Sequence, residues 1–231
     1  RARSAPSVLG RQGAEDRRMT RFIFVRHGES KSNENGTFTG QTDVALSALG
    51  KRQAQALKEH LLRNYTIDRI YASDLKRAYD TVLPFAEAAG LPVQKEPLLR
   101  EINGGKWEEK PIPFIAETYP EDYARWCENV GLARCTGGES MAEVQARGSA
   151  VLNRLAKEND GKTVLIGTHA GFLRAMQCLW QGLPLERMKD IPWVPNASVT
   201  EVRYGSGAPV LVRLADVSFL RGAVTELTKG I

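Results

Sequence analysis

The sequence predicts an α/β protein, a three-layer α/β/α sandwich in which helices cover both faces of a mostly parallel central sheet. Short apolar segments alternate with longer amphipathic ones along the 231 residues, which is the order expected where each strand is followed by a helix. The centres of two short segments, 21–26 (RFIFVR) and 163–168 (TVLIGT), are apolar throughout. Strands of this kind are buried on both faces, which is typical of parallel sheets.

Turn and cap residues mark where the elements begin and end. Ser47 is placed to cap one helix, and Ser73 or Asp74 to cap the next, which ends before Gly90. Pro84 lies inside that second helix and is expected to kink it. The predicted strands are 21–26, 68–72 and 163–168, with a hairpin formed by 198–204 and 210–214. The predicted helices are 47–63, 73–89, 140–158 and 171–180, while the loop 28–44 and the segment 93–110 are expected to be irregular.

One domain is predicted over 19–231, with a small helical cap inserted at about 104–138. Within the cap, Pro113 and Pro120 interrupt an aromatic-rich stretch, which favours short helices. Residues 1–18 are set apart, because they carry five arginines against two acidic residues and lack apolar periodicity. We interpret these residues as an unstructured extension, a processing remnant or an artificial tail.

Composition limits the classes of function. The chain is 42% hydrophobic and 26% charged, as in ordinary globular proteins, and no apolar run approaches the roughly 20 residues that a membrane span needs. Three cysteines without CxxC spacing favour a reducing compartment, so the cytoplasm is the expected location. Residues 1–18 contribute +3 of the formal charge of +5. Because no basic stripe interleaves with aromatic residues, nucleic-acid binding is not expected.

Polar residues that suit a phosphate group follow the predicted strands. His27 and His169 come directly after the two most apolar strands, and Arg26 precedes His27. Arg77 lies in the first turn of the helix that follows the strand 68–72. Ligands of open α/β sheets bind beyond the carboxyl ends of the strands, so these four side chains are expected to converge. Guanidinium groups match phosphate oxygens, and neutral imidazole is a nucleophile.

The segment 26–30 (RHGES), together with Asn33, resembles the RHG(E/T) signature of the histidine phosphatase superfamily, which includes the cofactor-dependent phosphoglycerate mutases. RHG alone is a weak signal, but an ordered series of motifs extends the resemblance over nearly the whole chain after Met19. The further segments are 39–43 (TGQTD), 73–78 (SDLKRA), 99–108, 137–140 (GGES) and 167–171 (GTHAG). The resemblance implies a phosphoglycerate mutase-like fold.

The resemblance also implies roles for individual residues. His27 would attack phosphorus and become phosphohistidine, while Glu101 would protonate the leaving oxygen and later deprotonate the attacking water. Without the resemblance, Glu101 would be interpreted as a surface ion-pair partner of Arg100. The groups implied to hold the phosphoryl oxygens are Arg26, Asn33, Thr39, Gly40, Arg77 and His169. The clustered cations are expected to keep His27 neutral near pH 7.

We expect a phosphomonoesterase that hydrolyses a small phosphorylated metabolite. The alternatives are a phosphoglycerate mutase-type isomerase and, less favoured, a phospho-ligand binder without turnover, for which the acid Glu101 would be superfluous. The segment between Glu101 and His169 is shorter than in the mutases of this family, and it offers only the separated Arg125 and Arg134 for a second acidic group. This favours the phosphatase.

The cap offers candidates for the leaving-group pocket. Its aromatic residues either wall that pocket or pack the cap helices against each other, and packing is the favoured reading. They are Trp107, Phe114, Tyr119, Tyr123 and Trp126. Lys106 is a candidate for binding a carboxylate or a second phosphate, with solvent exposure as the alternative. Where many relatives carry Trp-Glu-Gly, this chain has Glu109 in place of the glycine, which leaves the shape of that loop open.

No cofactor is expected, because hydrolysis through histidine needs only water. No metal site is predicted either, since the acidic residues lack DxD-type clustering and the two histidines are not spaced as a helical ligand pair. The expected partner is a small phosphate ester, with a homodimer left open.

Overall fold

The computed structural model describes residues 19–225, so the segment 1–18, predicted to be a tail, lies outside the described residues. Within this range the centre is a six-stranded sheet of order β3-β2-β4-β1-β5-β6. The strands are β1 (Thr20–Arg26), β2 (Arg69–Ala72), β3 (Val93–Lys95), β4 (Thr163–Thr168), β5 (Val199–Tyr204) and β6 (Val210–Asp216). β1 to β4 are parallel, whereas β5 and β6 are antiparallel to their neighbours. The predicted mostly parallel sheet is confirmed.

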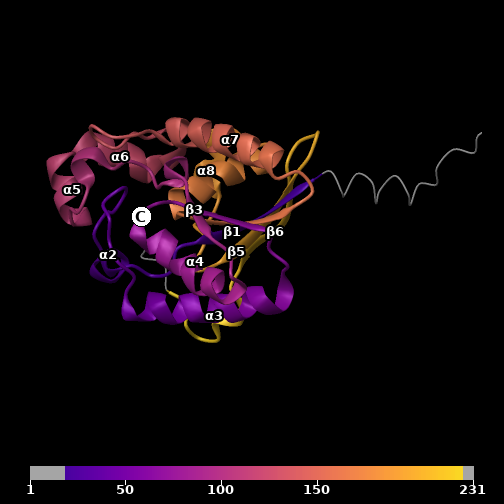
Figure 1. The fold of residues 1–231 in the computed structure, drawn as a ribbon. Helices are drawn as coiled ribbons and strands as arrows, with labels where there is room; N and C mark the ends of the chain where they lie inside the picture. The colour runs from indigo at the N-terminus through magenta and orange to yellow at the C-terminus, as the bar shows by residue number, and fades with distance from the viewer. Residues whose placement is uncertain (1–18, 226–231) are drawn as a thin grey trace, which may run out of the picture.

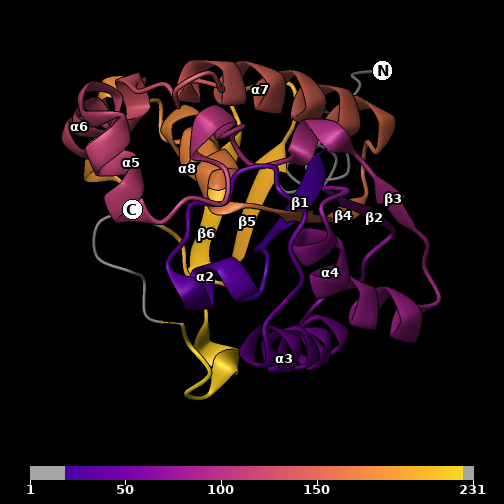
Figure 2. The same ribbon diagram turned by 90° about the vertical axis from the view of Figure 1, so that its left-hand side faces the viewer.

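Helices cover both faces of this sheet, as Figure 1 and Figure 2 show. α3 (Ala48–Asn64) and α4 (Lys76–Ala89) lie on one face, and α7 (Met141–Glu158) and α8 (Ala170–Trp180) lie on the other. Side chains of β1 alternate between the two cores that result. Phe22 and Phe24 belong to the core beneath α7 and α8, whereas Ile23 and Val25 belong to the core beneath α3 and α4. This burial on both faces explains the continuous apolar sequence of the central strands.

The helix boundaries test the predicted caps. Ser47 caps α3, since its side chain accepts a hydrogen bond from the backbone of Gly50, and Gly90 ends α4 with a φ of 66°. The predicted cap of α4 by Ser73 or Asp74 is wrong. That helix begins at Lys76, its N-cap is Leu75, and no side chain caps it. The reason is that Ser73 and Asp74 are engaged with distant residues, His169 and Arg100.

Two short elements lie where irregular structure is predicted. α2 (Lys31–Asn35) falls in the polar loop after β1, and β3 falls in the segment 93–110. Both are too short to leave a periodic pattern in the sequence. The remaining elements are the 3₁₀ turns Pro97–Leu99, Gly105–Trp107, Val130–Leu132, Leu185–Asp190 and Ser218–Leu220.

The segment predicted to form the cap contains two short helices, α5 (Ile112–Thr118) and α6 (Pro120–Glu128). A proline occupies a first-turn position of each helix, where a missing N–H costs no hydrogen bond. Figure 1 shows α5 and α6 at the same end of the molecule as α2, and Figure 2 looks onto this end. The functional groups are sought there.

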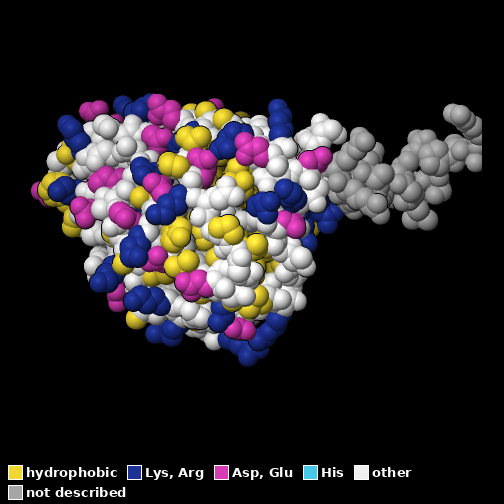
Figure 3. All heavy atoms as spheres, in the orientation of Figure 1, with side chains coloured by type: hydrophobic (Ala, Val, Ile, Leu, Met, Phe, Trp, Pro, Cys, Tyr) yellow, Lys and Arg dark blue, Asp and Glu magenta, His cyan; other side chains and the backbone are white. Residues whose placement is uncertain are grey.

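The surface is of mixed character. On the face shown in Figure 3, Lys and Arg side chains are interspersed with acidic and apolar ones rather than gathered in one patch. Among residues 19–225, no helix combines the length and the apolarity that crossing a membrane requires.

Candidate active site

The two histidines that follow strands lie side by side at one edge of the sheet. β1 and β4 are adjacent and parallel, with Arg26 opposite Thr168 in the register. The next residue of each chain segment, His27 and His169, therefore lies at the same level. Their ring centroids are 5.2 Å apart, and both side chains are buried. The strand-end placement thus brings the two imidazoles together as the sequence predicts.

The hydrogen bond of His27 determines which ring nitrogen is free. Nδ1 lies 2.7 Å from the carbonyl oxygen of Gly28, and a carbonyl can only accept, so Nδ1 carries the proton. Nε2 of the neutral ring then keeps its lone pair, and His27 lines the main pocket. Burial, followed by the charges of Arg77 and Arg26, lowers the pKa of His27 well below the usual histidine value. The imidazole is thus neutral near pH 7, as the clustered cations predict, but burial contributes more to the shift than the cations do.

His169 is held by a residue that sequence reasoning assigned to a helix cap. Its Nε2 lies 2.8 Å from Oγ of Ser73, which follows β2. Burial, followed by the charge of Arg77, lowers the pKa of His169 well below its ordinary value. Its Nδ1 is buried and has no hydrogen-bond partner among the described residues. The ring is therefore held through Nε2, while Nδ1 can still form a hydrogen bond.

Two buried arginines border the histidine pair. Arg77 lies in the first turn of α4, is 1% exposed, and donates to the carbonyl oxygens of Gly40 and Thr42 at 2.6 and 2.9 Å. Arg26 donates to the carbonyl oxygen of Val194. Neither forms an ion pair within residues 19–225, and burial lowers the pKa of Arg26 to about 10. Two buried cations without a paired carboxylate are costly, and a bound anion would offset that cost.

Glu108 holds the loop that positions Arg77. Its carboxylate accepts hydrogen bonds from the backbone N–H groups of Gly40, Gln41 and Thr42 at 3.0, 2.7 and 3.1 Å. It also accepts from Thr42 Oγ1 at 2.8 Å and from the N–H of Gly104 at 2.8 Å. Gly40 is required at its position, because a Cβ there would lie 2.2 Å from a backbone oxygen and 2.4 Å from the Glu108 carboxylate. The loop thus presents its carbonyl groups to Arg77.

Glu101 lies at the N-terminus of α8, away from the surface. Its Oε2 accepts from the N–H of Gly171 at 2.9 Å, and its Oε1 accepts from those of Phe172 and Ile102 at 3.1 and 3.0 Å. A Cβ at position 171 would lie 2.4 Å from Oε1, so glycine is required there. The alternative reading as a partner of Arg100 is excluded, because Arg100 pairs with Asp74. Glu101 is 8% exposed and lines the pocket.

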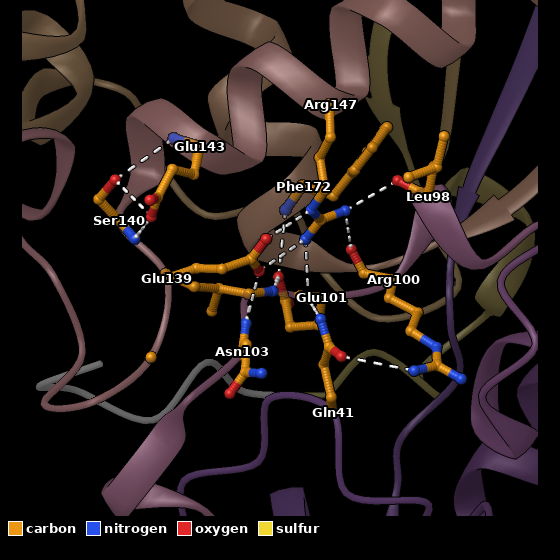
Figure 4. A network of polar contacts seen from close by, with 12 residues as sticks. Gln41, Leu98, Arg100, Glu101, Asn103, Glu139, Ser140, Glu143, Arg147 and Phe172 are labelled. Carbon is orange, nitrogen blue, oxygen red and sulfur yellow. Dashed lines mark hydrogen bonds and ion pairs between the residues drawn. The ribbon is translucent and has the colours of Figure 1, made fainter.

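Arg147 of α7 holds the backbone that carries Glu101. Its guanidinium donates to the carbonyl oxygens of Leu98, Arg100 and Glu101 at 2.8, 2.8 and 2.9 Å. Glu139 pairs with the same guanidinium at 2.9 Å. Figure 4 shows this network converging on Arg147, with the Glu101 side chain directed toward Phe172. The acid is therefore supported by two elements rather than by a mobile loop.

Asn33 and Asn196 complete the polar lining. Oδ1 of Asn33 accepts from the N–H of Ser30 at 3.1 Å and from Nδ2 of Asn196 at 3.5 Å. These bonds fix the amide orientation, so the NH₂ group of Asn33 is its remaining donor. Nδ2 of Asn196 also donates to the carbonyl oxygen of His27 at 3.0 Å. Both asparagines line the pocket.

Not every residue implied for phosphate binding borders the pocket. Thr39 does, and its Oγ1 is buried without a partner, as is Nε of Arg26. His169, which is 0% exposed, does not line the pocket. Gly40 does not line it either; its N–H donates to Glu108 and its carbonyl oxygen accepts from Arg77. Unpaired buried polar atoms are rare. A bound phosphoryl group would accept hydrogen bonds from both Thr39 Oγ1 and Arg26 Nε. Gly40 acts here on Arg77 rather than on a ligand.

The cap candidates divide into different environments. Trp126 lines the pocket, whereas Trp107 is 0% exposed and packs edge-on against Phe38 and Trp126. Tyr119 and Tyr123 pack against the same core, and Phe114 is 43% exposed. Trp107, Tyr119 and Tyr123 therefore pack the cap, as the favoured interpretation expects, and Trp126 also forms part of the pocket wall.

The cations proposed for a second acidic group lie outside the pocket lining. Lys106 is exposed. Arg125 approaches Glu121 and Asp122 on its own helix, and Arg134 pairs with Glu143. The solvent-exposed alternative for Lys106 is therefore correct.

Sequence reasoning missed several residues that shape the site, among them Arg147 of α7, which holds the backbone of Glu101. Ser73 and Glu108 lie within the quoted motifs, but only their tertiary contacts reveal their tasks. Asn196 and Trp193 belong to a loop after the 3₁₀ turn Leu185–Asp190, where no periodic pattern singles them out. Within the described chain, no group of three or more His, Cys, Asp or Glu side chains is placed to hold a metal ion.

The fold and the site together define a phosphoric monoester hydrolase. The chain belongs to the histidine phosphatase superfamily (branch 1), whose family model matches residues 22–217. Phosphoserine phosphatase 1 of Hydrogenobacter thermophilus is 36% identical over 213 residues, which cover 92% of this chain and 100% of that protein. Glucosyl-3-phosphoglycerate phosphatase of Mycobacterium tuberculosis is 33% identical, covering 83% and 88%. The solved structure of Bacillus stearothermophilus YhfR superposes with a TM-score of 0.83 at 27% identity, covering 87% of this chain and 99% of that one.

Proposed function

We propose that this protein hydrolyses a small phosphorylated metabolite through a phosphohistidine at His27. The observation that supports it most is the free Nε2 of a neutral imidazole beside a second histidine and two buried arginines that lack a paired carboxylate. A phosphoryl dianion would neutralise Arg26 and Arg77 and accept their remaining N–H groups. Asn33 and Thr39, which line the pocket, supply further donors to its oxygens. His169 lies behind this lining, and in this proposal its unpartnered Nδ1 is a further donor.

In the first step the Nε2–phosphorus bond forms as the bond from phosphorus to the ester oxygen breaks. Arg26 and Arg77 stabilise the charge on the transferring oxygens. Glu101, in its acid form, gives its proton to the leaving oxygen, which departs as an alcohol. Of its two carboxyl oxygens, Oε2 accepts one N–H and Oε1 accepts two, so Oε2 is the oxygen that can carry the transferred proton.

In the second step a water molecule attacks the phosphohistidine. Glu101, now a carboxylate, takes a proton from the water as the new oxygen–phosphorus bond forms and the nitrogen–phosphorus bond breaks. Inorganic phosphate leaves, and His27 and Glu101 return to their starting states. Burial of His27 supports the first step, because a protonated ring could not attack phosphorus.

A hydrolase fits this pocket better than a mutase. A mutase must hold the acidic group that its substrate carries besides the phosphate, and Arg26 and Arg77 are the only lysine or arginine side chains among residues 19–225 that line the pocket. Both are needed at the phosphoryl group.

The test is phosphate release from a panel of phosphorylated metabolites, with His27→Ala as control. We expect free phosphate from the native protein, a loss of more than about 10³-fold in kcat/KM for the variant, and an acid-labile phosphoenzyme that the variant lacks. Activity that survives the substitution would refute the nucleophile. Label recovered in an isomeric phosphoester instead of free phosphate would favour the mutase.

A cytoplasmic location is proposed on the three cysteines, none of which forms a disulfide: Cys127 is exposed, and Cys135 and Cys178 are buried. The homodimer stays a prediction that a mass measurement in solution would test.

A further inference from the structure

Among residues 19–225, the pocket lining offers no positive charge beyond the groups that handle phosphate. Its ionisable lining residues within 19–225 are Arg26, His27, Arg77 and Glu101, all assigned above to the phosphoryl group or to proton transfer. The other lining side chains are neutral. Among them, Phe38, Ile102, Trp126, Met141 and Trp193 are apolar. A substrate carboxylate or second phosphate would be desolvated there without a cation to pair it.

Two tryptophans of this lining are held in place. Trp126 is 5% exposed and packs edge-on against Phe38, with ring centroids 5.7 Å apart. Trp193 is half-buried, and the guanidinium of Arg174 lies 4.3 Å from its ring centroid. Arg174 is itself 7% exposed and fixed by a bond of 2.8 Å from its Nε to the carbonyl oxygen of Ile191. Aromatic faces fixed in this way bind apolar or flat groups without losing conformational freedom.

Arg174 cannot serve as the missing cation. It does not line the pocket, and the ring of Trp193 lies against its charged group. The pair therefore presents an indole to the ligand rather than a guanidinium. Arg174 acts as a positioning residue for that indole.

We propose that the substrate is the phosphomonoester of an uncharged alcohol with an apolar or flat body, and that Trp193 and Trp126 contact this body. The inference rests on the proposed function, since it concerns the leaving group of the same hydrolysis. It sets the chain apart from a phosphatase whose leaving alcohol carries a carboxylate, such as serine.

The test compares 2-phenylethyl phosphate with O-phospho-L-serine. Both are primary alkyl esters, so the comparison reports recognition of the body rather than leaving-group reactivity. We expect kcat/KM for the phenylethyl ester to exceed that for phosphoserine by about tenfold or more. Equal or faster turnover of phosphoserine would overturn the inference.

Variants identify the side chains that contact the apolar part of the leaving alcohol. Trp193→Ala should lower kcat/KM for 2-phenylethyl phosphate by about tenfold, mainly through KM, and change that for ethyl phosphate less than about threefold. Trp193→Phe should restore most of the loss, and Phe114→Ala, at an exposed aromatic of the cap outside the pocket, should have no effect. An equal loss on both esters would overturn the assignment. If His27→Ala retained activity on every ester, the proposed function itself would fail, a result separate from the substrate preference.

Discussion

Replacing Glu108 by glutamine tests whether this carboxylate positions Arg77. The carboxylate accepts five hydrogen bonds, two at Oε1 and three at Oε2. An amide accepts at one end only. If the NH₂ group takes the place of Oε1, the N–H groups of Gln41 and Gly104 lose their acceptor. If it takes the place of Oε2, the N–H groups of Gly40 and Thr42 lose theirs. At least two backbone donors therefore lose their acceptor in either orientation.

The magnitude follows from those two bonds. A hydrogen bond to a charged group contributes about 1.5–3 kcal/mol, so Glu108→Gln should lower the free energy of unfolding by about 3 kcal/mol. Because the same loop supplies both carbonyl partners of Arg77, kcat/KM should fall by about 10- to 100-fold. The control is Glu109→Gln, which removes the same charge from the next, exposed residue. Urea unfolding and steady-state phosphate release measure the two effects. A Glu108→Gln protein within about twofold of native kcat/KM would refute the reasoning.

Two further predictions concern stability. The depressed pKa values of His27 and His169 mean that the unfolded chain binds more protons than the folded one below about pH 6.5, so the free energy of unfolding should fall as pH is lowered through that range. The slope is at most about 1.4 kcal/mol per pH unit for each histidine, and His60, whose pKa burial also lowers, adds a contribution of the same sign. Urea titrations should therefore show a shallower slope in His27→Gln, and an unchanged slope would contradict the assignment. Glu109 has a φ of 59°, in the left-handed region where glycine is unstrained. Glu109→Gly should therefore be more stable than Glu109→Ala by about 1 kcal/mol in thermal unfolding, and the reverse order would show that the loop relaxes.

The layered fold was predictable because its signals are local and periodic. β1 and β4 are apolar throughout their centres, and Ser47 and Gly90 mark helix ends by their own chemistry. The convergence of the two histidines follows from that pattern alone. Short elements such as α2 and β3 leave no such signal and were missed.

The supports of the site could not be predicted in the same way. Serine is a common helix cap, and the sequence does not show that Ser73 lies beside His169, with which it forms a hydrogen bond. Glu108 acts on a loop that precedes it by more than 60 residues, and Trp193 gains its fixed orientation from Arg174 on another element. Such pairings depend on how separate loops meet, which residue spacing does not encode.

The pairing of β1 with β4 also governs when activity can arise during biosynthesis. β1 precedes β4 in the chain, and the cap and α7 lie between them. A nascent chain that ends within α7 would contain His27, Arg26 and Arg77, but neither His169 nor the N-terminus of α8 that binds Glu101. If the proposed mechanism holds, a chain truncated within α7 should not hydrolyse phosphoesters.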